Sequence, residues 1–201
     1  VSHFIFSSSC TVYGEPDYIP VDEKHPVKQP SSPYGATKQM CEKILEDLSA
    51  SSDLKVISLR YFNPAGAHSS SLIGELPLNE PTNLVPVITR TAVGKMKELV
   101  VFGSDYDTPD GSCIRDYIHV TDVAAAHVSA LERMTENKSK SNFEVFNLGT
   151  GKGLTVLEVI KTFENITGKK LNYRIGNRRE GDVSKIYSDC KLANAELKWQ
   201  A

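Results

Sequence analysis

A tyrosine and a lysine four residues apart are the pair in this sequence best suited to acid–base chemistry. They stand in the segment Tyr34-Gly-Ala-Thr-Lys38. On a helix, such a pair lies on one face, one turn apart. A nearby ammonium group favours the phenolate, so Lys38 is expected to lower the pKa of Tyr34 from about 10 towards neutrality. Tyr34 is therefore a candidate general base. The alternative is a packed tyrosine beside a solvated lysine.

Three serines form a second candidate feature, directly after an apolar run. Residues 4–6 are Phe-Ile-Phe, typical of a short buried strand, and Ser7-Ser-Ser9 follow. Open α/β sheets bind their ligands outside the carboxyl ends of the strands. A hydroxyl at this position could relay a proton, whereas the alternative is a serine-rich turn that only caps the strand.

The elements that must position these groups alternate between strands and helices. Strands are expected at residues 4–6, 56–59, 99–102, 143–148 and 171–175, and helices at 34–48, 83–97, 122–134, 155–168 and 190–197. Pro33 suits a helix start, Asn83 and Thr121 are expected N-caps, and Thr155 with Glu158 forms a capping box. Residues 60–81 and 104–115 are expected to be loops. This alternation predicts an α/β fold with parallel strand pairing.

Composition excludes several classes of function. The 201 residues carry 23 basic and 25 acidic side chains, a net charge of −2, which gives the chain no electrostatic reason to bind nucleic acid. No apolar run approaches the roughly 18 residues of a membrane span. The 4 cysteines are scattered without a Cys-x-x-Cys pair, which argues against zinc or a disulfide scaffold and suits the cytoplasm.

The two ends of the sequence indicate a piece of a larger protein. A strand-like run begins at His3 with almost no lead-in, and residues 197–201 stop without a helix cap or tail. We expect further chain on both sides.

Several short motifs, in order along the chain, resemble the extended short-chain dehydrogenase/reductase superfamily and, within it, the UDP-glucose 4-epimerase family. The resemblance runs from residue 4 to Trp199. The motifs that carry it include FIFSSSCTVYG at 4–14, SPYGATK at 32–38, RYFNPAGAH at 60–68, FGSDYD at 102–107, RDYIHV at 115–120, NLGTG at 147–151 and RREGD at 178–182. The family's glycine-rich cofactor turn has no counterpart here and belongs upstream of Val1.

The resemblance implies both a fold and an activity. The fold is the C-terminal part of a doubly wound Rossmann-type parallel sheet plus a smaller α/β substrate-binding domain. Residues 1–67 would belong to the NAD-binding domain and 68–201 mainly to the UDP-sugar-binding domain, with about 116–148 returning to the first. The activity is reversible epimerisation of UDP-glucose and UDP-galactose at C4, through a transient 4-keto sugar and bound NAD, in galactose metabolism. A homodimer formed through the helix at 34–48 is also implied.

The resemblance assigns roles around the reacting carbon. Tyr34 would take the proton from the sugar 4-hydroxyl, and Ser9 would hydrogen-bond the same oxygen and shuttle the proton. Lys38 would contact the cofactor ribose and tune Tyr34, and Phe62 would lie against the nicotinamide. These four residues are the expected cofactor contacts, and no metal is needed.

The resemblance also implies a set of contacts with the nucleotide sugar. Arg115 and Arg179 are suited to bidentate binding of a diphosphate. Asn83 also heads a helix, whose free N–H groups favour phosphate. The whole set is Asn63, Asn83, Leu84, Val101, Phe102, Arg115, Arg179, Asp182 and Ile186, with Val101 and Phe102 beneath the uracil, Asp182 facing the ribose and Ile186 lining the sugar pocket. For residues 178–182 alone, a surface cluster of ion pairs is the alternative.

Two further patterns are interpreted as structural. Gly149-x-Gly151-x-Gly153 has the wrong spacing for a dinucleotide loop and is expected to be a tight turn with close backbone packing. The histidines at 68, 119 and 127 are not expected to form a metal site.

Two other functions remain as alternatives. A nucleotide-sugar 4,6-dehydratase would need an Asp-Glu pair where this chain has Cys10-Thr11. A non-catalytic nucleotide-sugar-binding fragment is the other.

Overall fold

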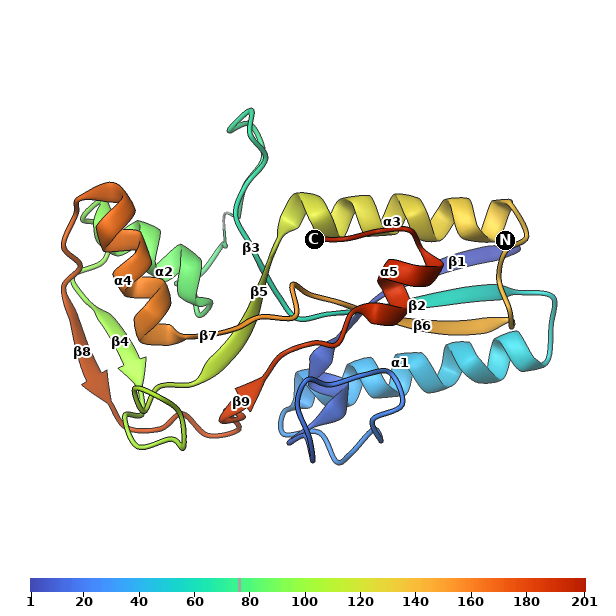
Figure 1. Cartoon of the computed structure of the whole chain (residues 1–201), viewed down its shortest axis with the longest axis horizontal. Coiled ribbons are helices and arrows are strands. Elements are labelled where there is room, and N and C mark those ends of the chain that lie inside the picture. The colour runs from blue at the N-terminus through green and yellow to red at the C-terminus, as the bar shows by residue number, and fades with distance from the viewer. Residues whose placement is uncertain (76) are drawn as a thin grey trace.

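The computed structural model describes residues 1–75 and 77–201 and has two lobes linked by strands that run between them (Figure 1). The first lobe is built on three parallel strands in the order β1-β2-β6, namely β1 His3–Ser9, β2 Lys55–Tyr61 and β6 Phe143–Leu148. Helix α1, Pro33–Ala50, packs on this sheet. Figure 1 shows α3, Val120–Thr135, across the sheet from α1. The predicted α/β class with parallel pairing is confirmed.

The core of the first lobe lies between the sheet and α3. Ile57 and Leu59 of β2 and Phe146 of β6 are fully or almost fully buried there against Ala126 and Met134 of α3. The short helix α5, Lys191–Glu196, joins the same cluster through Ala193, Leu197 and Trp199. Alanine at the sheet-facing positions of α3 allows this helix to approach the strands closely.

Helix α1 begins where its sequence predicts. The Ser32 side chain accepts a hydrogen bond from the Gly35 N–H at 3.1 Å, and Pro33 occupies the first turn. Its outer face is unusually apolar for an exposed helix, because Met40, Ile44 and Leu48 are all exposed. These positions are four residues apart and form one stripe along the helix.

The second lobe packs two helices against a two-stranded sheet. Its elements are α2 Leu84–Ala92, α4 Val156–Thr167, β4 Leu99–Phe102 and β8 Tyr173–Gly176. Ile88, Leu99, Val101, Ile160 and Leu171 form its core. The predicted capping box of α4 is confirmed in both directions, from Thr155 and from Glu158.

Strands that the sequence analysis did not predict join the two lobes. β5, Ile114–His119, pairs with β3 Asn63–Ala65, β7 Gly153–Thr155 and β9 Lys185–Ile186. β3, β7 and β9 have only two or three residues each, too few for a recognisable alternation, and the polar residues Arg115, Asp116 and His119 interrupt the apolar pattern of β5.

A fully buried aspartate explains why β5 is stable despite its polar sequence. Asp116 accepts hydrogen bonds from the backbone N–H groups of Thr150, Gly151 and Ser188 and from two hydroxyls. A side chain at Gly149 would lie 2.4 Å from the Asp116 carboxylate. The close backbone packing expected of residues 149–153 is therefore confirmed, whereas the segment bends between β6 and β7 without a hydrogen-bonded turn.

Two predicted helix boundaries are wrong. The helix expected at 83–97 ends at Ala92, and Gly94 follows with φ +74°, a left-handed conformation that glycine adopts without strain. Thr121 is not the N-cap of α3. The cap is His119, whose ring nitrogen accepts from the Thr121 N–H at 3.2 Å.

The expected division at residue 67 stays a prediction. Residues 120–135 and 143–148 do pack in the first lobe, and so do Ala193, Leu197 and Trp199 near the C-terminus, which the expected division places in the second domain. Among the described residues, no helix combines the length and apolar character needed to cross a membrane. No three His, Cys, Asp or Glu side chains within residues 1–75 and 77–201 are placed to hold a metal ion.

Candidate active site and nucleotide pocket

The carboxyl end of β1 brings the candidate catalytic residues together. Ser9 ends the strand and caps a short 3-10 helix, Cys10–Tyr13, with its Oγ accepting from the Thr11 N–H at 3.2 Å. Lys38 of α1 donates from Nζ to the Ser7 carbonyl oxygen at 2.8 Å. This bond ties the Tyr-x-x-x-Lys helix to the serine run, as expected of a shared site.

The Tyr34 phenol is accessible, but its acidity differs from the prediction. Burial on one side raises the pKa of Tyr34, the nearby Tyr61 raises it further, and hydrogen bonding to Ser9 acts in the opposite direction. Lys38 Nζ lies 5.5 Å from the Tyr34 ring centroid and is engaged with Ser7. The expectation that the pKa of Tyr34 falls towards neutrality is wrong, because burial outweighs the hydrogen bond to Ser9.

Phe62 and Ile186 lie deeper than the sequence analysis implied. Both are about 95% buried and belong to one apolar cluster with Val12, Tyr13 and Val21. Neither lines the cavity described below. Their expected contacts with cofactor and sugar stay predictions. In this structure they pack in the same cluster as Cys10, the residue that follows Ser9.

Thr11 is a site candidate that the sequence analysis missed. Its Oγ1 is buried and has no hydrogen-bond partner among the described residues. A buried hydroxyl without a partner costs free energy, so such groups are usually satisfied by a ligand or water. Thr11 stands two residues after Ser9, and its type alone gave no signal in the sequence.

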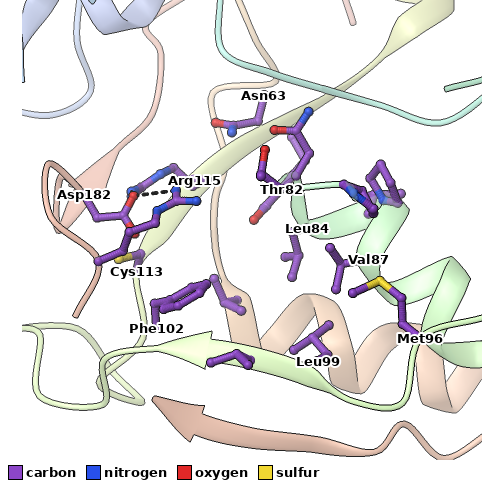
Figure 2. Close-up of a pocket in the computed structure, with 18 of the residues that line it drawn as sticks. Asn63, Thr82, Leu84, Val87, Met96, Leu99, Phe102, Cys113, Arg115 and Asp182 are labelled. Atoms are coloured by element: carbon purple, nitrogen blue, oxygen red, sulfur yellow. Dashed lines mark hydrogen bonds and ion pairs between the residues drawn. The ribbon is translucent and has the colours of Figure 1, made fainter. Parts of the chain in front are cut away.

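A cavity of about 380 Å³ lies in the second lobe between α2, β4 and β5 (Figure 2). Seven of the nine predicted substrate contacts line it. They are Asn63, Asn83, Leu84, Phe102, Arg115, Arg179 and Asp182. Residues more than 100 positions apart in the sequence are thus collected around one space.

Two arginines converge on one carboxylate at the rim of the cavity. Arg179 Nη2 lies 2.8 Å from Asp182 Oδ1, and Arg115 Nη2 lies 3.5 Å from the same oxygen. The Arg179 guanidinium also stands over the Phe102 ring, 5.6 Å from its centroid. Two cations share one anion at this corner of the cavity, and Glu98, which also lines the cavity, is paired with Arg174. The two guanidinium groups are therefore suited to bind a diphosphate.

The N-terminus of α2 adds backbone donors to the same cavity. Asn83 occupies the N-cap position as predicted, but its side chain makes no capping bond and instead donates to Glu75 at 3.0 Å. The N–H groups of the first turn, at Leu84 and Val85, are therefore left for another acceptor beside the cavity. Helix N-termini favour anions.

Val101 does not line the cavity, and its predicted place beneath the uracil stays a prediction. Side chains alternate along β4, and Val101 points into the core of the second lobe with 1% exposure. Its neighbours Val100 and Phe102 line the cavity instead. The sequence analysis also missed Met96 and Cys113 of the cavity wall, which have no chemical signature in the sequence.

Fold and site together define a class of protein. A parallel sheet with helices on both faces, a tyrosine and lysine beside a serine at a strand end, and a cavity with two arginines in a second lobe are features of a Rossmann-like nucleotide-binding protein. The family model described as NAD dependent epimerase/dehydratase matches residues 1–149. The chain belongs to this family.

Similar proteins and structures narrow the comparison. UDP-glucose 4-epimerase of Yersinia enterocolitica is 52% identical over 202 residues, which cover 100% of this chain and 59% of that protein. The structure of UDP-glucose-4-epimerase from Stenotrophomonas maltophila, with bound NAD and formylated UDP-arabinopyranose, superposes with a TM-score of 0.95 at 48% identity, over 100% of this chain and 59% of the other. The Bifidobacterium longum enzyme in complex with NAD+ and UDP also gives 0.95, at 46% identity and the same coverage. The chain thus spans about three fifths of the length of these relatives.

Proposed function

We propose that this chain is part of a UDP-glucose 4-epimerase, an isomerase that interconverts UDP-glucose and UDP-galactose through a transient 4-keto sugar. The observation that carries the proposal is the meeting of Tyr34, Lys38 and Ser9 at the carboxyl end of β1. Similarity over all of this chain, and over 59% of the length of the relatives, to enzymes of that name supports it.

Tyr34 and Ser9 are the proposed proton-handling pair. The phenolate oxygen of Tyr34 accepts the proton of the sugar 4-hydroxyl, and Ser9 Oγ hydrogen-bonds that oxygen and passes the proton. Two related structures hold NAD, and NAD would accept and return the C4 hydride.

Tyr34 and Lys38 fit the role of holding that cofactor. The Tyr34 side chain is exposed, and Lys38 presents its ammonium group beside it. Phe62, buried in the same cluster as Cys10, would support the nicotinamide side from within rather than by an exposed face.

The cavity is the proposed UDP site. Arg115, Arg179 and the first turn of α2 would bind the diphosphate, and Phe102 would lie against the uracil. Asn63 and Asp182 would supply polar contacts to the sugars.

An assay of the full-length protein tests the proposal. It should convert UDP-galactose to UDP-glucose, detected by chromatography of the nucleotide sugars. A product lacking the 6-hydroxyl would indicate a dehydratase instead. UDP binding without turnover would favour the non-catalytic alternative, which the partial length of this chain keeps open.

A homodimer through α1 is part of the proposal. The stripe of Met40, Ile44 and Leu48 gives α1 an apolar outer face with no partner in the described chain. Ile44→Lys should shift the full-length protein from dimer to monomer in light scattering, because a buried lysine without a partner is costly. Ile166→Lys, at an exposed isoleucine of α4, is the control and should leave the mass unchanged. A monomeric wild type would end the idea.

The substrate range is expected to be narrow because Ile186 is buried and β-branched. It packs with Phe62 and Cys10 in the cluster next to Ser9, and its stiff side chain would leave little space for a 2-acetamido group. Ile186→Ala should raise activity on UDP-N-acetylgalactosamine relative to the hexose by about 10- to 100-fold. The measurement is the ratio of kcat/KM values. Equal rates on both sugars in the unmodified protein would contradict the prediction.

The four free cysteines support a reducing compartment, for which we propose the cytoplasm.

A further inference from the structure

A buried carboxylate that the proposed chemistry does not use lies on the same helix face as the proton-handling residues. Glu42 of α1 is 6% exposed. It follows Lys38 by four residues and Tyr34 by eight, which places all three along one stripe of the helix. A carboxylate in such a position needs strong partners to remain charged.

Glu42 has those partners, and all of them come from the sheet. Its Oε1 accepts hydrogen bonds from Ser8 Oγ at 2.6 Å, Ser58 Oγ at 2.7 Å and Arg60 Nε at 2.9 Å. Its Oε2 accepts from Arg60 Nη2 at 2.6 Å. Burial alone would raise the pKa of Glu42, but the bonds from Arg60, Ser8 and Ser58 hold it below the ordinary value.

Two of these partners lie at the strand end, because Ser8 of β1 and Arg60 of β2 are paired in register, but only Ser8 belongs to the serine run. Ser8 stands between Ser7, whose carbonyl oxygen receives Lys38, and Ser9, whose hydroxyl acts on Tyr34. Ser58 lies in β2 opposite Phe6, away from that end. The Glu42–Ser8 bond therefore joins α1 to β1 at the point where the proton-handling groups face each other.

We propose that Glu42 is a positioning residue which, through its bond to Ser8, fixes the rotation of α1 on the sheet and so sets the separation between the Tyr34 and Ser9 hydroxyls. The inference rests on the proposed function of those two groups. A rotation of α1 about its axis would carry Tyr34 away from Ser9. Displacement of a catalytic group by about 1 Å can reduce turnover by about 10²-fold.

Two serines make a matched test, because both are fully buried and both donate to Glu42 Oε1. Ser8→Ala in the full-length protein should lower kcat by about tenfold with KM nearly unchanged. Ser58→Ala removes an equivalent bond and should leave kcat within about twofold. Equal kcat losses in the two variants, or losses that only follow thermal stability, would overturn the proposal.

A second pair of variants distinguishes the effect of the Glu42 charge from the effect of its position. Glu42→Gln keeps the length and loses the charge, and Glu42→Asp keeps the charge but withdraws it by one methylene. Positioning predicts that both lower kcat by about 10- to 100-fold without moving the pH profile of kcat. A shifted profile in Glu42→Gln alone would mean that Glu42 acts through its charge, which contradicts the proposal.

A readout without turnover separates this inference from the proposed function. In ligand-free protein labelled with ¹³C-tyrosine, the Tyr34 signal is assigned by its absence in Tyr34→Phe. Ser8→Ala should shift this signal and Ser58→Ala should not. If the wild type shows no epimerase activity while the shift appears, the proposed function fails and the positioning role stands. An unmoved Tyr34 signal in Ser8→Ala refutes the positioning role whatever the activity.

Discussion

Replacing Tyr34 with phenylalanine should lower kcat of the full-length protein by about 10²–10⁴-fold, the usual contribution of a general acid–base group. The aromatic ring is kept, so only the phenolic oxygen is lost. UDP affinity should change little, because Tyr34 does not line the cavity. Steady-state turnover of UDP-galactose and calorimetric titration with UDP measure the two effects.

The pH dependence gives a second check on the same residue. Burial raises the pKa of Tyr34, so the phenol is protonated at neutral pH in the chain without ligands. A general base works only when deprotonated, so kcat should rise with pH and level off above the pKa of Tyr34. Tyr34→Phe should abolish this rise.

An exposed tyrosine elsewhere supplies the control. Tyr173 lies on β8 in the second lobe, and Tyr173→Phe should leave both turnover and its pH profile unchanged. Turnover of Tyr34→Phe within a few-fold of the wild type would remove Tyr34 from the proton transfer.

The sequence predicted the elements with long, regular periodicity. The strand at 143–148 and the helix behind Thr155 have the predicted bounds to within a residue or so. β5 and the strands that pair with it were missed because they are stabilised by hydrogen bonds from residues far away in the sequence. Asp116 is a poor strand residue by type, and it is stable there only because Thr150, Gly151 and Ser188 donate to it.

Most residues of the cavity could be predicted from the sequence, but which side chains face the cavity could not. The chemical types of Arg115 and Arg179 indicated anion binding, the family resemblance added Asp182, and the fold collects all three around one space. Burial could not be predicted at single positions. Val101 points into the core because of its register in β4, and Ile186 packs in the same cluster as Cys10 because β9 pairs with β5.

The second large effect is expected at the two arginines of the cavity. Arg115→Ala or Arg179→Ala should each weaken UDP binding by about 10- to 100-fold, since hydrogen bonds to charged groups contribute about 1.5–3 kcal/mol. UDP itself should show the weaker binding, because UDP and the UDP-sugars share the diphosphate. Arg115 is the more buried of the two, with its side chain 15% exposed against 50% for Arg179, so its loss is expected to be the larger.

The neighbouring arginine is a control with the same charge. Arg178 bonds Asp105 at 2.8 Å, stacks 4.2 Å from the Tyr106 ring centroid and does not line the cavity. Arg178→Ala removes one positive charge next to Arg179 but should leave UDP affinity within about twofold, because a charge outside the site acts only through screened, long-range attraction. Raising the salt concentration should weaken UDP binding to the wild type. Calorimetry that finds unchanged affinity in both Arg115→Ala and Arg179→Ala, or an equal loss in Arg178→Ala, would show that the diphosphate binds elsewhere.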